Sequence, residues 1–321
     1  MDLNGHFRLP RVASERRTLM IKSFDEIMEK VKKQQRKRIV VAAAQDEPVL
    51  EAVRDAVSEG FIEAILVGDR EKIVEIAHKI NFNVNDLEII DEADNTKAAL
   101  KAVQLVSSGK ADMLMKGLLE TSTILKAVLN KEIGLRTGRL MSHVAVFEIP
   151  GFDRLIFITD AAFNMYPDLK AKIDILNNAV TVAHAVGIEM PKVAPICAVE
   201  VVNPDMPATI DASILSKMNE RGQIKGCIVD GPLAVDNALS EEAARHKKIN
   251  SPAAGKADIL LLPNIEAGNV MYKTLTYTTE AKNGGILVGT SAPVVLTSRA
   301  DSPESKLYSI ALAALAADLN K

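Results

Sequence analysis

Hydrophobic and polar residues alternate along this chain in blocks. Before residue 130, short apolar runs such as "RIVVAAAQ" and "IEAILVGD" are separated by longer stretches with apolar residues at helical spacing. Such runs are typical of buried strands, and the stretches between them are long enough for crossover helices. We therefore expect βαβ units that build a mostly parallel sheet. The predicted strands cover residues 38–45, 62–69, 87–91 and 111–117, and the predicted helices cover residues 46–58, 70–79, 95–108 and a segment opening at Thr121 or Ser122.

The block pattern breaks between residues 140 and 160. Two apolar runs, "LMSHVAVFEIP" and "RLIFITDAA", are separated there by "GFD" alone. A gap of this length cannot hold a crossover helix, so the two runs predict an antiparallel hairpin. We interpret this break as a domain boundary.

The alternation resumes after the hairpin and continues to the C-terminus. The last helix follows Ser302 and carries apolar residues at helical spacing from Leu307 to Leu315. One apolar face of this length is expected to dock on a sheet. The predicted strands here cover residues 192–199, 226–231, 257–263 and 284–298, and the predicted helices cover residues 168–186, 211–220, 240–248 and 269–279, with a further helix that starts at Met20.

The early hairpin and the closing strand and helix suggest a split first domain. The chain would leave that domain before completing it and return at its end. This gives a discontinuous α/β domain of residues 20–142 and 286–321 and an inserted α/β domain of residues 143–285. Residues 1–19 lack the pattern and are expected to be a disordered leader or extension. The cleft between two domains is the expected place for a site.

The charge balance favours a small or polar substrate. The chain has 39 basic and 42 acidic side chains, a net charge of −3, which calls for neither nucleic acid nor an anionic membrane. The basic run "EKVKKQQRKR" has no aromatic interleaving and is interpreted as an exposed helix face. Apolar stretches fall short of the roughly twenty residues of a membrane span. Cys197 and Cys227 lie in apolar runs and predict reduced, buried thiols in a cytoplasm.

Several common chemistries lack their motifs in this chain. The first crossover, "AAAQDEPVLEA", has no glycine, so no dinucleotide fingerprint is present, and no Walker motif occurs. The five histidines show no recognised metal-ligand spacing, and no G-x-S-x-G is found. We therefore expect no cofactor, no metal and no acyl-enzyme of the hydrolase type.

Polar clusters follow several predicted strands, where open α/β sheets place their ligands. "MKGLLETST" combines Lys116 with Thr121 at a helix start, a setting that suits an anion, although a capped helix beside a surface lysine explains it equally well. "TDAAFNMYPD" contributes Asp160 and Asn164. "VDGP" contributes Asp230.

Two further segments add candidate anion binders. "LLPNIEAGNVMYK" holds Asn264, Asn269 and Lys273; Lys273 would share a helix face with Asn269, for which helix capping is the simpler role. "IGLRTGRLMSH" places Arg136 and Arg139 in a glycine-rich loop before the boundary, although a loop arginine is often merely solvated.

The stretch "PVVLTSRADSPES" joins the last apolar run to the last helix. Ser302 and Pro303 explain the start of that helix. Capping does not explain the adjacent pair Ser298 and Arg299. In the split-domain interpretation this pair lies at a strand end facing the interdomain cleft.

Three segments in this order, "TDAAFNMYPD", "VDGPLAVDNALS" with "SPAAGKADILLLPNIEAGNVMYK", and "PVVLTSRADSPES", resemble the phosphate acetyl/butyryltransferase family. The match covers almost everything from Met20 to the end. "ADMLMKGLLETST" and "PVVLTSRADSPES" look closer to the butyryl branch than to the acetyl branch, which carries a serine in place of Lys116.

The resemblance implies a two-domain, three-layer αβα fold like that of isocitrate and isopropylmalate dehydrogenases, commonly as a homodimer. It implies the reaction acyl-CoA plus phosphate giving acyl phosphate plus CoA, with butyryl as the expected acyl group and direct transfer in a ternary complex. Coenzyme A and phosphate would then be substrates, and no cofactor would be needed.

The resemblance also implies roles for the candidate residues. Ser298 and Arg299 become the catalytic pair, with Arg299 on the phosphate and Ser298 on the oxyanion or thiol. In the acetyl branch a carboxylate seven residues beyond the serine is the proposed base, but Ser305 stands there, and the base stays open between Asp301, Glu304 and neither. The expected substrate-binding residues are Lys116, Thr121, Arg136, Asp160, Asn164, Asn264, Asn269 and Lys273.

The same residues are also compatible with other functions. The chain could be a phosphate acetyltransferase or a relative on the same fold, such as an acyl-carrier-protein phosphate acyltransferase or a hydroxythreonine-phosphate dehydrogenase. It could also be a two-domain anion-binding protein without chemistry, which would bind a ligand but show no turnover.

Overall fold

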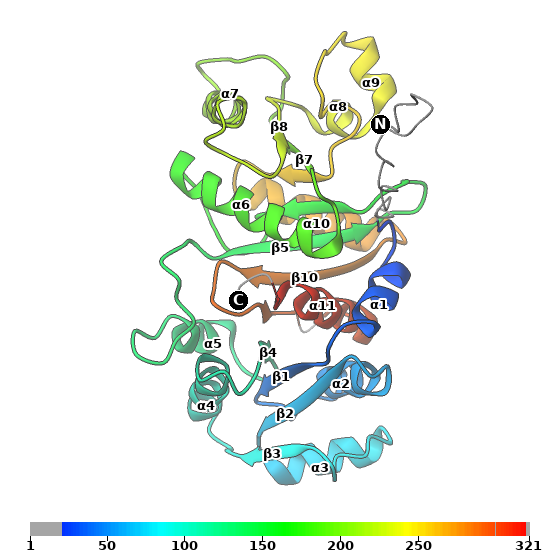
Figure 1. Ribbon diagram of the computed structural model, residues 1–321, viewed down its shortest axis with the longest axis vertical. Coiled ribbons are helices and arrows are strands. Elements are labelled where there is room, and N and C mark those ends of the chain that lie inside the picture. The colour runs from blue at the N-terminus through cyan, green and yellow to red at the C-terminus, as the bar shows by residue number, and fades with distance from the viewer. Residues whose placement is uncertain (1–20, 299, 319–321) are drawn as a thin grey trace, which may run out of the picture.

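The computed structural model describes residues 21–298 and 300–318, so the predicted leader lies outside the described residues. They form one mixed sheet, in the order β3-β2-β1-β4-β11-β10-β5-β6-β9-β7-β8, with helices on both faces (Figure 1). The predicted α/β class is confirmed. The strands are β1 Lys37–Ala42, β2 Ile62–Gly68, β3 Glu88–Asp91, β4 Met113–Lys116, β5 Ser142–Glu148, β6 Ile156–Thr159, β7 Lys192–Pro195, β8 Ile228–Val229, β9 Ile259–Leu261, β10 Lys282–Val288 and β11 Val294–Val295. The helices are α1 Phe24–Lys32, α2 Glu47–Ser58, α3 Arg70–Lys79, α4 Asn95–Ser107, α5 Thr121–Val128, α6 Leu169–Val186, α7 Pro207–Glu220, α8 Val235–Leu239, α9 Glu241–His246, α10 Ile265–Thr278 and α11 Pro303–Ala316.

Most strands inside the sheet are apolar on both faces because helices cover both. Alternate residues of a strand point to opposite sides. In β1, Ile39 and Val41 join a core that includes α1, α2 and α11, whereas Val40 and Ala42 join a core with α4 and α5. This two-sided burial explains why the sequence shows continuous apolar runs rather than strict alternation.

The middle of the sheet is antiparallel. β5 pairs with β6 in the predicted hairpin, and on its other side with β10, from Glu148 opposite Lys282 to Ser142 opposite Val288. β11 then lies parallel to β4. The last strand and α11 therefore pack beside elements of the first 130 residues, as Figure 1 shows. The division into two domains itself stays a prediction.

Three helices, α1, α7 and α10, begin several residues away from their predicted starts. α1 begins at Phe24, not at Met20, which lies outside the described residues; Ser23 Oγ caps it by accepting the N–H of Glu26 at 3.2 Å. α7 begins at Pro207, four residues before the predicted start, because proline fits the first turn of a helix without needing its missing N–H.

The start of α10 corrects the prediction for Asn269. The helix begins at Ile265, and Asn264 is its cap, since Asn264 Oδ1 accepts the N–H three residues on at 3.0 Å. Asn269 lies inside the helix. Gly268 allows close packing of the helix, since a Cβ there would lie 2.3 Å from the carbonyl oxygen of Asp160.

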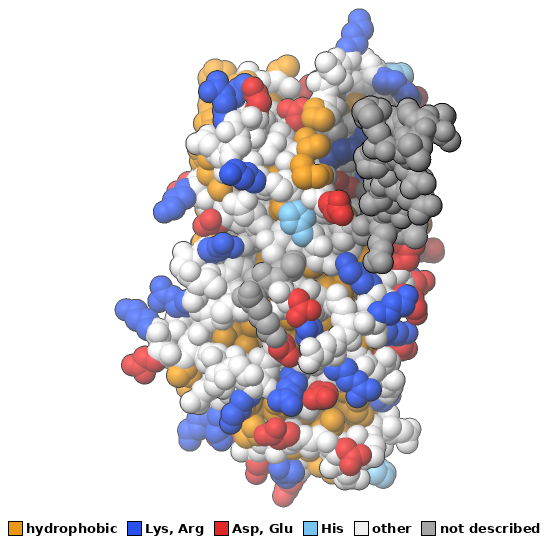
Figure 2. Space-filling view, viewed as in Figure 1, with side chains coloured by type: hydrophobic (Ala, Val, Ile, Leu, Met, Phe, Trp, Pro, Cys, Tyr) orange, Lys and Arg blue, Asp and Glu red, His pale blue; other side chains and the backbone are white. Residues whose placement is uncertain are grey.

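Charge is spread over the surface. On the face in Figure 2, basic and acidic side chains are interspersed among the described residues. The basic run of residues 29–38 spans the end of α1 and the start of β1, so the predicted exposed helix face covers only part of it. Most of its charged side chains are exposed or half-buried. Lys37 is 5% exposed because its ammonium group pairs with the carboxylate of Asp318. None of the described helices is both long and apolar enough to span a bilayer.

Candidate active site

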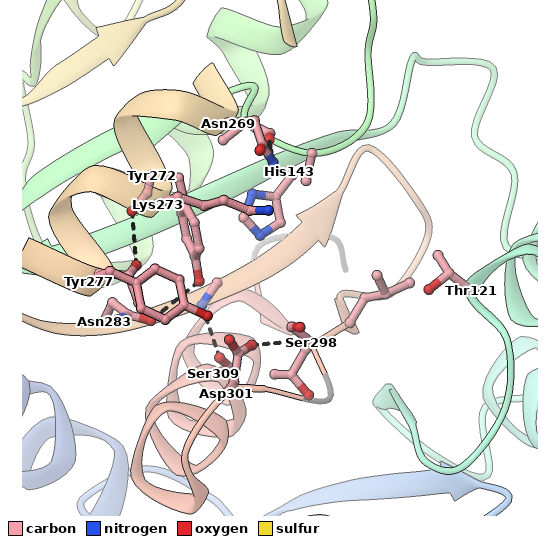
Figure 3. A pocket seen from close by; sticks show the side chains of 16 residues that line it. Thr121, His143, Asn269, Tyr272, Lys273, Tyr277, Asn283, Ser298, Asp301 and Ser309 are labelled. Atoms are coloured by element: carbon pink, nitrogen blue, oxygen red, sulfur yellow. Dashed lines mark hydrogen bonds between the residues drawn. The ribbon is translucent and has the colours of Figure 1, made fainter. Parts of the chain in front are cut away.

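A cavity of about 330 Å³ lies between α10, the paired strands β5 and β10, and the segment that leads into α11 (Figure 3). Its volume is at the lower end of the ~300–1,000 Å³ typical of small-ligand pockets. It is large enough for a small ligand or for the reacting end of a larger one. The polar residues on its wall are Thr121, His143, Asn269, Tyr272, Lys273, Thr276, Tyr277, Asn283, Thr297, Ser298, Asp301 and Ser309.

Ser298 lies in a tight turn between β11 and α11. Its N–H donates to Asp301 Oδ2 at 2.7 Å, and the N–H of Asp301 donates back to its carbonyl oxygen at 3.2 Å. Lys306, in the first turn of α11, donates to the same Ser298 carbonyl at 3.1 Å and to the carbonyl of Asp301. These bonds fix the turn at the cavity wall. Arg299, the other predicted catalytic residue, lies outside the described residues.

Two buried lysines flank this turn. A second cavity of about 120 Å³ shares Ser298 with the first and is lined by Lys116 and Lys306, which are 6% and 2% exposed. Lys116 Nζ donates to two nearby backbone carbonyls, at 3.3 and 3.2 Å. Burial lowers the pKa of Lys306, and the carboxylate of Asp301 opposes that shift. Amino groups placed like this beside Ser298 suit an anionic substrate.

The helix α10 supplies the facing wall. Asn269 Nδ2 donates to the carbonyl oxygen of Ala161 at 3.3 Å, which ties the helix to the loop after β6. Lys273 follows one turn later, and both residues line the cavity, as their predicted common helix face requires. Asn264 lines neither of the two cavities and uses its side-chain oxygen to cap α10.

Asp160 and Asn164 hold the loop that carries Ala161. Asp160 is 3% exposed, and its oxygens accept four backbone N–H groups at 2.9–3.2 Å, including those of His143 and Asn164. Asn164 Nδ2 donates to Asp160 at 2.7 Å and to the carbonyl of Met141 at 2.9 Å. Neither side chain lines the two cavities. Both therefore hold the loop that forms the cavity wall and do not face the cavity themselves.

The two remaining predicted residues lie apart. Thr121, the first residue of α5, lines the cavity across from the α10 side chains in Figure 3. Arg136 is exposed, forms an isolated bridge with Thr290 and lines neither cavity. Its predicted contact with substrate stays a prediction.

His143 is a cavity residue that sequence reasoning missed. It lies on β5 opposite Leu287 of β10 and is 8% exposed. Burial lowers the pKa of its imidazole, and the carboxylates of Asp160 and Asp301 act in the opposite direction. Its Nδ1 is buried and has no hydrogen-bond partner in the described part of the chain.

Other missed residues surround His143. Tyr272 Oη donates to Asn283 Oδ1 at 3.4 Å, and burial raises the pKa of this phenol. Ser309 Oγ accepts the N–H of Gly285 at 2.9 Å. A polar residue inside an apolar run was the available signal for Ser309, and it does not say which way the side chain points. Asn283 stands between Lys282 and a glycine, which gave no such signal.

The comparisons with known proteins bear on this site. The family described as phosphate acetyl/butaryl transferase matches residues 23–100 and 92–314 of the chain. The chain is also 71% identical over 298 residues to a phosphate butyryltransferase of Clostridium acetobutylicum, which covers 93% of this chain and 99% of the relative. The chain belongs to the phosphate acetyl/butaryl transferase family. The resemblance drawn from the motif series is thereby confirmed.

Members with other printed activities are similar as well. A phosphate acetyltransferase of Thermotoga maritima is 50% identical over 87% of this chain and 95% of its own length. Among solved structures, a branched-chain phosphotransacylase of Enterococcus faecalis V583 superposes with a TM-score of 0.76 at 34% identity, covering 88% of this chain and 99% of that one. A 4-hydroxythreonine-4-phosphate dehydrogenase homologue of Salmonella typhimurium, with a TM-score of 0.53 at 14% identity over 88% of this chain and 100% of that one, shares the fold alone. The predicted dehydrogenase-like architecture is therefore confirmed at the level of the fold.

Proposed function

We propose that this protein transfers a short-chain acyl group, butyryl in the first place, between coenzyme A and inorganic phosphate. Family membership and the 71% identical butyryltransferase support this. The observation that carries it is the Ser298 turn, which meets a cavity on one side and two buried lysines on the other. An anionic nucleophile and a carbonyl group could be held together there.

In the proposed reaction a phosphate oxygen attacks the thioester carbonyl carbon. A C–O bond forms, the carbonyl π electrons move to oxygen, and collapse of the tetrahedral intermediate breaks the C–S bond. Ser298 Oγ accepts a 3.3 Å bond from the N–H of Ala300, which leaves its hydroxyl proton free to donate to substrate. Arg299, Lys116 and Lys273 are proposed to bind the phosphate, which carries the charge that these groups offset.

Direct transfer is supported by the two cysteines. Burial raises the pKa of Cys197 and of Cys227 to about 11, so both are thiols near neutral pH. Neither lines the cavity. A covalent acyl-cysteine therefore has no support in the described residues.

Asp301 is the proposed base for the CoA thiol. It is the sole carboxylate among the described residues that line the cavity. Glu304 is engaged elsewhere, because its Oε1 accepts a hydrogen bond from Tyr308 Oη at 2.7 Å. Asp301 thus stands four residues before Ser305, the position at which the family resemblance led us to expect the acid.

We also propose the binding partners, the oligomeric state and the cellular compartment of this protein. Coenzyme A and phosphate are the partners, no cofactor or metal takes part, and neither nucleic acid nor a membrane is bound. The protein works as a homodimer in the cytoplasm. Mixed surface charge and a cavity sized for the reacting groups support the small-molecule part of this proposal.

Phosphate-dependent release of CoA thiol tests the function. Butyryl-CoA and acetyl-CoA are compared with and without phosphate, with a thiol-reactive dye as the readout. We expect release that needs phosphate and is faster with butyryl-CoA. Faster release from acetyl-CoA would support the acetyltransferase alternative, which has a 50% identical relative. Binding without release from either thioester would support a non-catalytic anion-binding protein.

A further inference from the structure

One buried polar group on the cavity wall takes no part in the chemistry proposed so far. The His143 side chain is 92% buried, given its exposed fraction of 8%, and its Nδ1 has no partner among the described residues. Its main chain is already used, since its N–H donates to Asp160 at 3.2 Å and its carbonyl accepts from Thr159 Oγ1 at 2.8 Å. No hydrogen bond of the ring to the described part of the chain explains why an imidazole is buried here, and such groups call for an explanation.

The sheet leaves room for this ring. Gly285 of β10 lies diagonally opposite His143, and a Cβ there would lie 2.7 Å from Nε2 and 3.1 Å from Cε1. Glycine weakens a strand interior and marks close approach of another group. On the α10 side the ring meets Tyr272 edge-on, with centroids 6.1 Å apart. The Nε2 edge therefore lies beside Gly285, which also lines the cavity.

Burial decides the charge and the tautomer of the ring. Desolvation outweighs the two nearby carboxylates, so the imidazole is neutral near pH 7. A buried N–H without an acceptor is rarer in proteins than an unpaired acceptor. Because Nδ1 has no acceptor, the proton belongs on Nε2. His143 thus offers an N–H donor at the cavity that no described residue uses.

We propose that His143 Nε2–H donates a hydrogen bond to the acyl carbonyl oxygen and stabilises it as it becomes the oxyanion. This rests on the acyl transfer proposed above. The phosphate lone pair forms the C–O bond, and the carbonyl π pair moves onto the oxygen that faces Nε2. When that pair returns, the C–S bond breaks and its electrons leave with sulfur. The histidine proton stays on Nε2 throughout.

A neutral donor suits this place better than a further cation. Lys116 and Lys306 flank Ser298, and Lys273 already lines the cavity from α10. A further positive charge at His143 would compete with these groups for phosphate. A neutral imidazole donates to a developing oxyanion without attracting the dianion in the ground state.

Asparagine and glutamine substitutions separate the two ring nitrogens. The side-chain amide of glutamine reaches about as far as Nε2, and that of asparagine about as far as Nδ1. For His143→Asn we expect kcat to fall by roughly 10²–10³-fold, the usual cost of an oxyanion donor, with little change in the KM for butyryl-CoA. His143→Gln should recover most of this loss and stay within about tenfold of wild type.

A second histidine provides the matched control. His184 on α6 lies outside the cavity, and its Nε2 is 2.8 Å from the carbonyl of Gly226. His184→Asn should leave kcat within about twofold, because it is not part of the machinery that binds the transition state. Thermal unfolding of all variants shows which of them fold.

The outcomes decide the proposal. It is overturned if His143→Asn keeps near-normal kcat, or if His143→Gln is as slow as His143→Asn, which would indicate a base or a packing role. If His143→Asn does not fold, the carbonyl stretch of bound butyryl-CoA decides. A shift to lower frequency in wild type that persists in His143→Gln supports the donor, and no shift overturns it. Wild-type protein without phosphate-dependent turnover overturns the acyl transfer itself, and this inference with it.

Discussion

The two sides of the cavity differ in charge. On the Ser298 side, Lys116 and Lys306 are buried around a turn that also holds Asp301. On the His143 side, the polar groups packed into the wall are neutral: an imidazole, the half-buried phenol of Tyr272 and the amide of Asn283. Lys273, the cation on this wall, is exposed. The difference between the two sides therefore lies in the charge that each stabilises.

This difference matches the two reacting groups. Phosphate brings its charge to the site, and fixed cations lower its free energy from the start. The carbonyl oxygen is neutral on arrival and becomes charged only in the transition state. A donor that is neutral and already oriented therefore favours the transition state over the ground state, which is what raises kcat. Variants on the Ser298 side should change phosphate kinetics, and variants on the His143 side should change kcat alone.

The largest effect is expected from Arg299→Ala. If this arginine binds phosphate as the family resemblance implies, its loss should lower kcat/KM for phosphate by roughly 10³-fold. Steady-state kinetics at varied phosphate measure it, with Arg299→Lys as the partner variant, because lysine keeps the charge but not the forked geometry. A near-normal rate for Arg299→Ala would exclude Arg299 as a phosphate-binding residue.

Lys306→Met should come next. Its Nζ donates to the carbonyls of Ser298 and Asp301, so its loss frees the turn, and small misplacements of this kind cost up to about 10² in rate. We expect the KM for phosphate to rise as well.

Lys37→Met is the matched control for Lys306→Met. Lys37 is also a buried lysine, but it pairs with Asp318 away from both cavities. Its substitution should lower the melting temperature and leave kcat/KM for phosphate near wild type. Equal losses of activity in the two variants would mean that stability, not the turn, decides the effect.

Capped helices could be predicted closely from sequence. The predicted range of α3 is the observed one, because Asp69 marks its start with a hydrogen bond to Lys72 N–H. The prediction for α10 was wrong because either Asn264 or Asn269 could have been the cap. The choice between them depends on Gly268 packing against the loop at Asp160, a contact that local sequence does not show.

The neutral side of the cavity could not be predicted for a related reason. Whether His143 points into a cavity depends on the register of β5 against β10, and on Gly285, far along the chain. Ser298 was easier to find, because the Ser-Arg pair stands outside any strand or capping pattern. A polar pair without a local role signals a site, whereas a polar residue inside an apolar strand does not.

Asp301→Asn tests whether Asp301, on the Ser298 side of the cavity, is the base for the CoA thiol. A thiol of pKa near 8.5 is only about 3% ionised at pH 7, so loss of the base should cost at most roughly 30-fold there. Since a variant cannot change the overall equilibrium, both directions should slow alike. In the acyl-CoA-forming direction the variant should regain rate as pH rises toward the thiol pKa. A pH profile that parallels wild type would exclude Asp301 as the base.

The smallest effect is expected from the double variant Cys197→Ser and Cys227→Ser, since neither cysteine lines either of the two cavities. Burial raises both pKa values to about 11, so near pH 7 each is a thiol and neither reacts as a thiolate. The double variant should keep kcat within about twofold, because no bond to sulfur in the protein forms during direct transfer. In wild type, iodoacetamide should label neither cysteine at pH 7 while the protein is folded, and mass spectrometry of the intact chain measures this. Loss of turnover in a folded double variant would reopen a covalent route and overturn direct transfer.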